Sequence, residues 1–334
     1  MGQDDDATDT TFEAARFAEV TLSMTYPIVS AWEFDFLREE EVIRRRWDGS
    51  TIYMVVQRPL TYFDNVVIGD GHIRFEIADG DRPPIACRVD LAANGICGAG
   101  EAVEVVVGFH AAAAGSGQPL RNVGAFQVFG ADGRFILWWS PQKLLYEMLV
   151  NGLAVETAVD ANPHAFLDFE VHYIGKSFSQ KVWNRLAGHR KLQRILTRER
   201  EVGTAPEARA PFEISLLILR VVAFSDIPMI GAAEGNPMLG PDPIVHRLDL
   251  SREGAYERFA MRPPVTLGDE ALTTEVEAML INRFRPKYNE VLFHNYPDIR
   301  GGMREKGYSW TALTFEQVPA LLHTEHFSMM PPEG

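Results

Sequence analysis

The chain has 334 residues, of which 46% are hydrophobic, and a formal net charge of −14 at pH 7. This length allows two domains of ordinary size, and the composition is normal for a soluble globular protein. The negative net charge excludes a protein that coats nucleic acid by bulk attraction, but it allows one that binds nucleic acid at a local basic site.

The sequence carries no sign of a membrane or secreted protein. No apolar run approaches the roughly 18 to 20 residues that a membrane helix requires, and the acidic start MGQDDDATDT is unlike a secretory signal or a transit peptide. Cys87 and Cys97 are too few for a disulfide scaffold and are expected to be buried thiols. We therefore expect a cytoplasmic protein.

The first half of the chain is expected to be rich in β-structure. Residues 1–15 are acidic and are predicted to be a disordered tail, followed by a β-rich domain over 16–150. Runs of β-branched and aromatic residues predict strands at 51–56, 66–68, 73–77, 103–109, 126–129 and 134–139. Ala131-Asp132-Gly133 predicts a hairpin turn between the last two. Recurrent turn residues between short strands are typical of a sandwich or barrel.

A helix predicted over 141–153 and the break at Asn162-Pro163 place the domain boundary near residue 150. The second domain, 151–334, is predicted as strand 166–174, helix 180–200, strand 213–224 and helix 269–284. Asp269 is a suitable N-cap for the last helix, and Pro286 ends it. The Gly- and Pro-rich stretch 225–268 is longer than most loops, so it is either a functional insertion or contains further elements.

Positive charge is concentrated between Lys176 and Arg200, where eight Lys or Arg residues stand against one acid, Glu199. Residues 1–165, in contrast, hold 24 acids and 12 bases, and would repel a polyanion. A basic helix would follow the phosphates of a nucleic-acid backbone, although a solvated helix surface is the ordinary alternative. The expected nucleic-acid contacts are Lys176, Lys181, Arg190, Lys191 and Arg194.

Three motifs occur in a fixed order in the second half. They are Tyr173-Ile174-Gly175-Lys176, then Arg185-Leu186-x-x-His189, then Glu277-x-x-Leu280-Ile281 followed by Pro286-x-Tyr288-Asn289. Together these motifs resemble those of the GIY-YIG nuclease family.

The resemblance implies an α+β protein in which the N-terminal β-rich domain precedes a small α/β nuclease domain. It implies a divalent-metal-dependent endonuclease that hydrolyses phosphodiester bonds of DNA, with RNA as an open alternative, in restriction or defence. The cofactor would be Mg²⁺ or Mn²⁺, held by Glu277. One carboxylate suffices, because Mg²⁺ keeps several of its waters and itself polarises the phosphate.

The resemblance also assigns roles to the other motif residues. Arg185 would bind the phosphate, since its planar fork suits two oxygens. Tyr173 would bond the attacking water or act as general base, and His189 would relay a proton or orient the nucleophile. Asn289 would orient its neighbours. Taken singly, each of these residues also has an ordinary structural role, such as a solvated helix side chain or a satisfied histidine.

The sequence departs from the family in one respect, because no G-I-Y tyrosine occurs in the usual position upstream of Tyr173. The missing strand could be Phe135–Trp139 without a tyrosine, Tyr146 could serve instead, or the base could be lost. The last possibility favours a nuclease-like module that binds nucleic acid or serves as an assembly subunit without cleaving. A homodimer, and a protein partner or ligand for the N-terminal domain, stay open.

Overall fold

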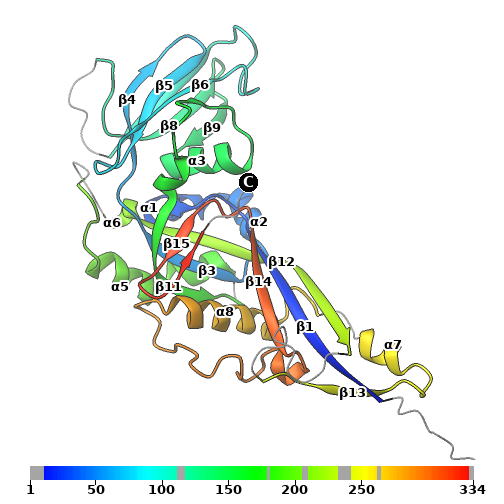
Figure 1. Ribbon diagram of the computed structural model, residues 1–334. Coiled ribbons are helices and arrows are strands. Elements are labelled where there is room, and N and C mark those ends of the chain that lie inside the picture. The colour runs from blue at the N-terminus through cyan, green and yellow to red at the C-terminus, as the bar shows by residue number, and fades with distance from the viewer. Residues whose placement is uncertain are drawn as a thin grey trace, which may run out of the picture.

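The structure, a computed structural model, describes residues 11–110, 117–178, 181–204, 210–231, 242–261 and 265–330. In these ranges the chain forms two β-sheets with helices packed around them, which confirms the expected α+β class (Figure 1). None of the helices in these ranges has the length and apolar character needed to span a membrane.

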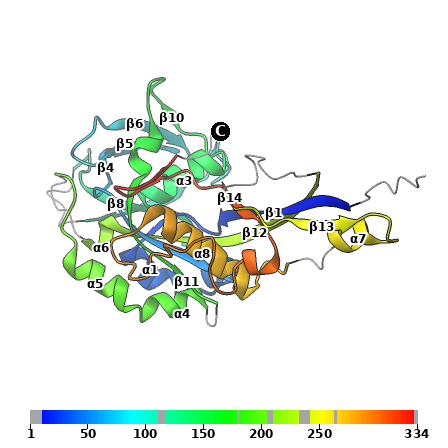
Figure 2. The ribbon, with the colours of Figure 1, turned by 60° about the horizontal axis from the view of Figure 1, so that its bottom comes forward.

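The first sheet combines strands from both ends of the chain. Its strands are β1 (Thr11–Met24), β2 (Val29–Ser30), β3 (Ile52–Gln57), β11 (Asp168–Lys176), β12 (Ile214–Ile230), β13 (His246–Asp249), β14 (Trp310–Glu316), β15 (Leu321–His323) and β16 (Ser328–Met329). Their order is β13-β1-β12-β3-β11-β15-β16, with β14 paired to β1 and β2 to β12. The N-terminal end of β1 and the C-terminal end of β12 extend away from the rest of the molecule, together with β13 and α7 (Ala255–Ala260) (Figures 1 and 2).

The second sheet is built from the chain segment between β3 and β11. It contains β4 (Tyr62–Ile68), β5 (His72–Ala78), β6 (Ile85–Asp90), β7 (Val103–Phe109), β8 (Val123–Gly130), β9 (Phe135–Trp139) and β10 (Glu156–Thr157). The order is β10-β6-β5-β4-β8-β7, with β9 paired to β8. Helix α3 (Pro141–Val150) and the short η1 (Pro163–Leu167) then lead back to the first sheet.

Helices cover both faces of the first sheet. Apart from α3, α7 and η1, the helices are α1 (Ala31–Leu37), α2 (Glu41–Trp47), α4 (Val182–Ala187), α5 (Arg190–Arg198), α6 (Ala210–Glu213) and α8 (Glu270–Phe284), together with the short η3 (Arg304–Lys306), within the described residues. Every residue of β3 is buried, and alternate side chains enter different cores. Met54 packs in the core that includes α8, whereas Tyr53 and Val55 pack in the core that includes α1, α4 and α5. Strand β3 is therefore central, with its side chains shared between the two layers of helices.

Several predicted elements are confirmed with close bounds. Strand β7 has the predicted limits, and β5, β9 and the turn at 131–133 lie where the sequence pattern placed them. Helix α8 begins after Asp269, whose side chain accepts a hydrogen bond from the Ala271 N–H, and it ends before Pro286. Cys87 and Cys97 are free thiols, as expected, although Cys97 is only partly buried.

The two sheets divide the chain differently from the boundary predicted near residue 150. Strands β1 to β3 belong to the same sheet as β11 and β12, and the second sheet is an insertion between β3 and β11. The sequence did not predict this division because β3 is a short strand buried on both faces, and the local sequence of such a strand does not show which strand it pairs with. Within the described residues, the part of the chain from 62 to 157 forms one seven-stranded sheet, whereas the sandwich or barrel was expected over 16–150.

One further predicted bound differs from the structure, and for the stretch 225–268 the alternative of further elements is confirmed. Residues 11–15 of the predicted tail lie in β1, while residues 1–10 fall outside the described residues. The stretch 225–268 contains the end of β12 together with β13 and α7, and its residues 232–241 and 262–264 also fall outside the described part.

Candidate active site

A tyrosine lies on the strand paired with the Tyr173 strand. Strands β3 and β11 are antiparallel, and their register places Tyr53 opposite Gly175. A Cβ atom on residue 175 would lie 2.6 Å from the Tyr53 hydroxyl oxygen and 2.7 Å from a ring carbon of Tyr173. Only glycine leaves room for both phenols here, which explains the Gly that follows Tyr173-Ile174.

The opposite edge of β11 is free of a strand partner where the site lies. Strand β15 pairs only with residues 168–170, so Ile174 has no strand on that side in the described chain. Asn289 takes its place. The Ile174 N–H donates to Asn289 Oδ1 at 2.9 Å, and Asn289 Nδ2 donates to the Ile174 carbonyl at 2.8 Å. Asn289 thereby fixes the turn that follows α8 against the Tyr173 strand.

The helix predicted over 180–200 is two helices. Helix α4 ends at Ala187 and α5 begins at Arg190, with Gly188 and His189 between them. His189 has an extended backbone and is the N-cap of α5, its Nδ1 accepting from the Leu192 N–H at 3.3 Å. A single helix would have placed Arg185 and His189 one turn apart on one face. The break instead turns the buried His189 ring toward Tyr53.

This cap also determines the protonation of His189. Because Nδ1 accepts a hydrogen bond, the proton of the neutral ring lies on Nε2. Nε2 is 3.0 Å from the Tyr53 hydroxyl oxygen, so His189 donates to Tyr53. Burial, with the nearby charges of Arg185 and Lys191, lowers the pKa of His189 to about 4. At neutral pH the ring is therefore an uncharged donor that orients Tyr53.

Both phenols are neutral groups in the free protein. Burial raises the pKa of Tyr53, and the neighbouring Tyr173 raises it further. Burial also raises the pKa of Tyr173, and the Glu277 carboxylate adds to this effect. The Arg185 guanidinium opposes both shifts and lowers the pKa of each tyrosine.

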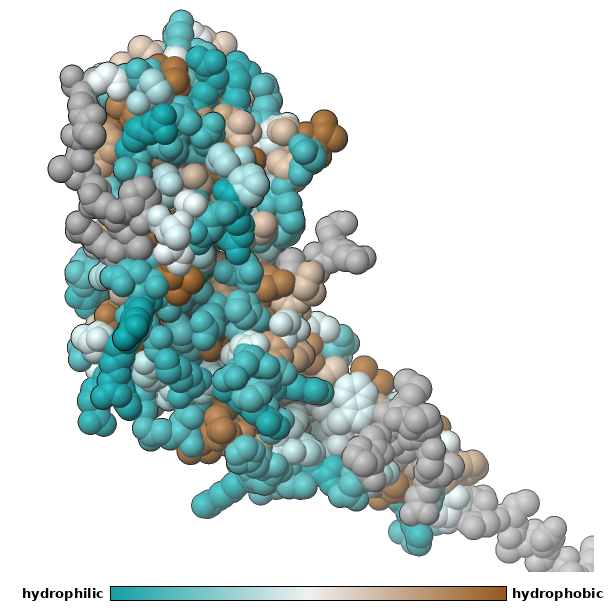
Figure 3. All heavy atoms as spheres, turned by 60° about the vertical axis from the view of Figure 1, so that its left-hand side comes forward, coloured by the Kyte–Doolittle hydropathy of each residue, from teal (hydrophilic) through white to brown (hydrophobic). Residues whose placement is uncertain are grey.

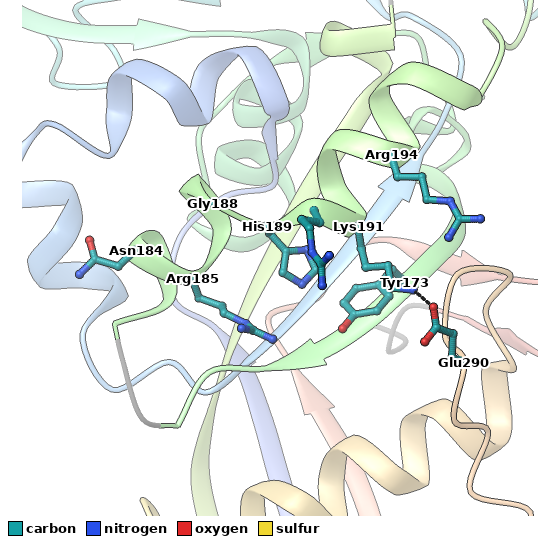
Figure 4. A pocket seen from close by; sticks show the side chains of 9 residues that line it. Tyr173, Asn184, Arg185, Gly188, His189, Lys191, Arg194 and Glu290 are labelled. Atoms are coloured by element: carbon teal, nitrogen blue, oxygen red, sulfur yellow. Dashed lines mark hydrogen bonds and ion pairs between the residues drawn. The ribbon is translucent and has the colours of Figure 1, made fainter.

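Two adjoining hollows meet at Tyr173 and Arg185, which line both of them. The larger is about 670 Å³, and its wall includes His189, Lys191, Arg194 and Glu290. Figure 4 shows the Tyr173 ring and the Arg185 side chain extending toward each other beneath the His189 ring. The smaller hollow is about 270 Å³ and is lined also by Lys176, Glu270 and Glu277.

Glu277 is therefore on the same hollow as Arg185. Its side chain is 14% exposed, and Lys176 Nζ lies 3.2 Å from its Oε2 and also donates to Thr274 Oγ1 at 2.8 Å. Burial raises the pKa of Glu277, while Lys176 and Arg185 lower it. Two groups about ninety residues apart in sequence thus converge on one concave surface.

A divalent cation would find a suitable ligand here. The Glu277 carboxylate is a hard oxygen donor facing a hollow wide enough for several waters, the arrangement that Mg²⁺ prefers. No group of three or more His, Cys, Asp or Glu side chains gathers as a metal cluster in the described ranges. The candidate metal site therefore rests on Glu277, with the exposed Glu270 at the rim of the same hollow.

The predicted nucleic-acid contacts divide into two groups. Arg190, Lys191 and Arg194 line the larger hollow with Arg185, whereas Lys176 lines the smaller one. Lys181 lines neither and forms an ion pair with Asp48. Figure 3, which brings the side of the molecule with α5 forward, shows a largely hydrophilic surface.

Sequence reasoning missed Tyr53. Phe135–Trp139 is β9 of the second sheet, and Tyr146 is buried on α3 in the large core, so neither supplies the strand beside Tyr173. The available signal was Thr51-Ile52-Tyr53 at the start of a predicted strand, which matches G-I-Y at two of three positions. It lies 120 residues before Tyr173 because the whole second sheet is inserted between them.

The Tyr173 phenol, a guanidinium, an imidazole and a carboxylate thus line one pair of hollows, with an ammonium on the carboxylate. The second phenol, Tyr53, is buried behind Tyr173. Such a set can hold a cation, bind a phosphate oxygen and orient a water molecule.

Comparisons with protein-family models, with curated proteins and with solved structures found no match to this chain.

Proposed function

We propose that this protein is a divalent-metal-dependent endonuclease of the GIY-YIG type that hydrolyses DNA phosphodiester bonds. The observation that supports it best is that Tyr173, Arg185 and Glu277 line one hollow, with Tyr53 and His189 directly behind. In this proposal Thr51-Ile52-Tyr53 would take the place of the G-I-Y motif, with Thr for Gly. A setting in restriction or defence is proposed from the resemblance alone.

Glu277 would hold the metal ion, which polarises the phosphate and lowers the pKa of bound water. Arg185 would bind the scissile phosphate through its planar fork, because it borders both hollows. Lys176 pairs with Glu277 in the free protein and would turn to a phosphate oxygen when the cation neutralises that carboxylate.

Tyr173 is the phenol that meets the attacking water, since it borders both hollows and Tyr53 is fully buried. Tyr53 holds its place behind Tyr173 through the hydrogen bond from His189 Nε2. A phenol takes a proton from water only after losing its own, and Arg185 is the side chain that lowers the pKa of both tyrosines. Arg185 therefore has two roles, one on the phosphate and one on the tyrosines.

The larger hollow supports a polyanionic substrate. Arg190, Lys191 and Arg194 extend the positive charge from Arg185 along α5, where they would contact phosphates on one side of the cleaved bond. Substrate binding and cleavage can then be tested separately, because Arg190, Lys191 and Arg194 line the larger hollow and Glu277 lines the smaller one.

The test is nicking of supercoiled plasmid with Mg²⁺ or Mn²⁺ by the parent, by Glu277→Gln and by Glu156→Gln, a control on the second sheet, with an RNA substrate in parallel. We expect metal-dependent nicking by the parent and by Glu156→Gln, and none by Glu277→Gln, although all three bind DNA in Ca²⁺. Equal inactivity of all three with intact binding would favour the module that binds without cleaving. Absence of both binding and cleavage would refute the proposal.

A further inference from the structure

One acidic side chain lines the larger hollow among its basic ones. The residues around this hollow include Arg185, Arg190, Lys191 and Arg194, and Glu290 is the sole carboxylate among the described residues that line it. Glu290 forms an ion pair with Lys191, drawn as the dashed line across the wall of the hollow in Figure 4. A carboxylate therefore sits where the charge pattern would attract a phosphate.

The position of Glu290 is set by its neighbour. Asn289 makes two hydrogen bonds to the backbone of Ile174, which fixes the chain at residue 289 against β11. The Glu290 carboxylate is 78% exposed, so no packing holds it on Lys191 other than the ion pair itself. Lys191 lowers the pKa of Glu290, with smaller contributions from Arg194 and Arg190, so the carboxylate stays ionised in weakly acidic solution.

We propose that Glu290 is an internal competitor of the substrate: it occupies Lys191 in the free protein and is displaced when a phosphate of the nucleic acid binds there. The inference rests on the proposed function, because it concerns a phosphate-binding hollow of the same site. Glu290 thereby limits affinity for short or singly contacting polyanions and favours substrates that engage several of the four cations at once.

The expected effect is modest because the ion pair is exposed. Exposed pairs contribute little, so release of Lys191 should tighten binding about two- to fivefold at low salt. The phosphate contact of Lys191 forms in both proteins, and salt screens the Glu290–Lys191 ion pair, so the gain in affinity should shrink as salt rises and log Kd should depend more steeply on log salt concentration in Glu290→Gln. The salt slope is the more specific readout, because a change in folding stability would not alter it.

The experiment compares four proteins by fluorescence anisotropy with a labelled 20-base-pair duplex in Ca²⁺, over a series of salt concentrations. They are the parent, Glu290→Gln, the double variant Glu290→Gln/Lys191→Gln, and Glu156→Gln. Glu156 forms a comparably exposed ion pair with Arg88 on the second sheet, so its variant controls for the change in net charge. We expect tighter binding and a steeper salt slope for Glu290→Gln only.

Parent-like or weaker binding by Glu290→Gln would overturn the inference. So would an equal gain in Glu156→Gln, which would indicate a net-charge effect, or an unchanged gain in the double variant, which would exclude Lys191. Titration of the same proteins with tripolyphosphate separates the two proposals. A parent that binds tripolyphosphate but neither DNA nor RNA contradicts the proposed function, and Glu290 is then judged by whether Glu290→Gln binds that anion more tightly.

Discussion

Replacing Asn289 with alanine should remove both hydrogen bonds that hold the open edge of β11. Each hydrogen bond contributes about 1 kcal/mol net, and a buried backbone group left without a partner costs about 1–3 kcal/mol more. Ile174 is fully buried, whereas Asn289 itself is partly exposed, so water can replace one of the lost bonds. We expect the free energy of unfolding to fall by about 2–4 kcal/mol.

The assay is urea unfolding followed by far-UV circular dichroism, with Asn282→Ala as the matched control. Asn282 lies on α8 and donates a single hydrogen bond, 2.9 Å long, to the Phe293 carbonyl. Its loss should cost about 1 kcal/mol. If Asn289→Ala were no less stable than Asn282→Ala, Asn289 would not be the group that fixes the β11 edge, and the account of the site geometry would be wrong.

Three further changes test other parts of the site. Gly175→Ala should lower both stability and any cleavage activity, because its Cβ would meet the Tyr53 hydroxyl at 2.6 Å; a variant with parent-like thermal stability and nicking rate would contradict this. The pKa of His189 is about 4 in the folded protein and about 6.5 when unfolded, so the unfolded state binds more protons between these values and stability should fall as pH drops from about 6.5 to 4. In His189→Gln this decline should be smaller when urea unfolding is compared at the two ends of that pH range, and an unchanged decline would refute the assignment. Arg185→Gln should raise the pKa of the catalytic phenol and move the alkaline rise of the cleavage rate to higher pH; a rate profile that is lowered but not shifted would limit Arg185 to the phosphate.

Elements with strong local signals were predicted well from the sequence. Helix α8 has an N-cap at Asp269 and a proline after its end, and β7 is a run of valines bounded by turn residues. These signals depend only on neighbours in sequence. For the same reason the α+β class and the motifs of the second half could be predicted together.

The parts that the sequence did not predict depend on non-local pairing or on an unusual cap. Strand β3 was found as a strand, but its pairing with β11 spans the whole inserted sheet, and no local pattern records it. The break between α4 and α5 depends on His189 as an N-cap, a role usually taken by Ser, Thr, Asp or Asn. Tyr53 could not be predicted as the partner of Tyr173, because the inserted sheet separates the two by 120 residues, far beyond the usual spacing of the two motifs.

The central claim is that the two ends of the chain build one site, with Tyr53 from β3 behind Tyr173 and Arg185. The most direct measurement is the rate of Mg²⁺-dependent plasmid nicking by the parent, Tyr53→Phe and Tyr146→Phe. Tyr53→Phe keeps the ring beside Gly175 but removes the hydroxyl that His189 contacts. Because Tyr53 positions Tyr173 and does not itself meet the water, we expect the loss that a misplaced group causes, about a hundredfold, for Tyr53→Phe, and a parent-like rate for Tyr146→Phe. A parent-like rate for Tyr53→Phe, or a comparable loss in Tyr146→Phe, would contradict it.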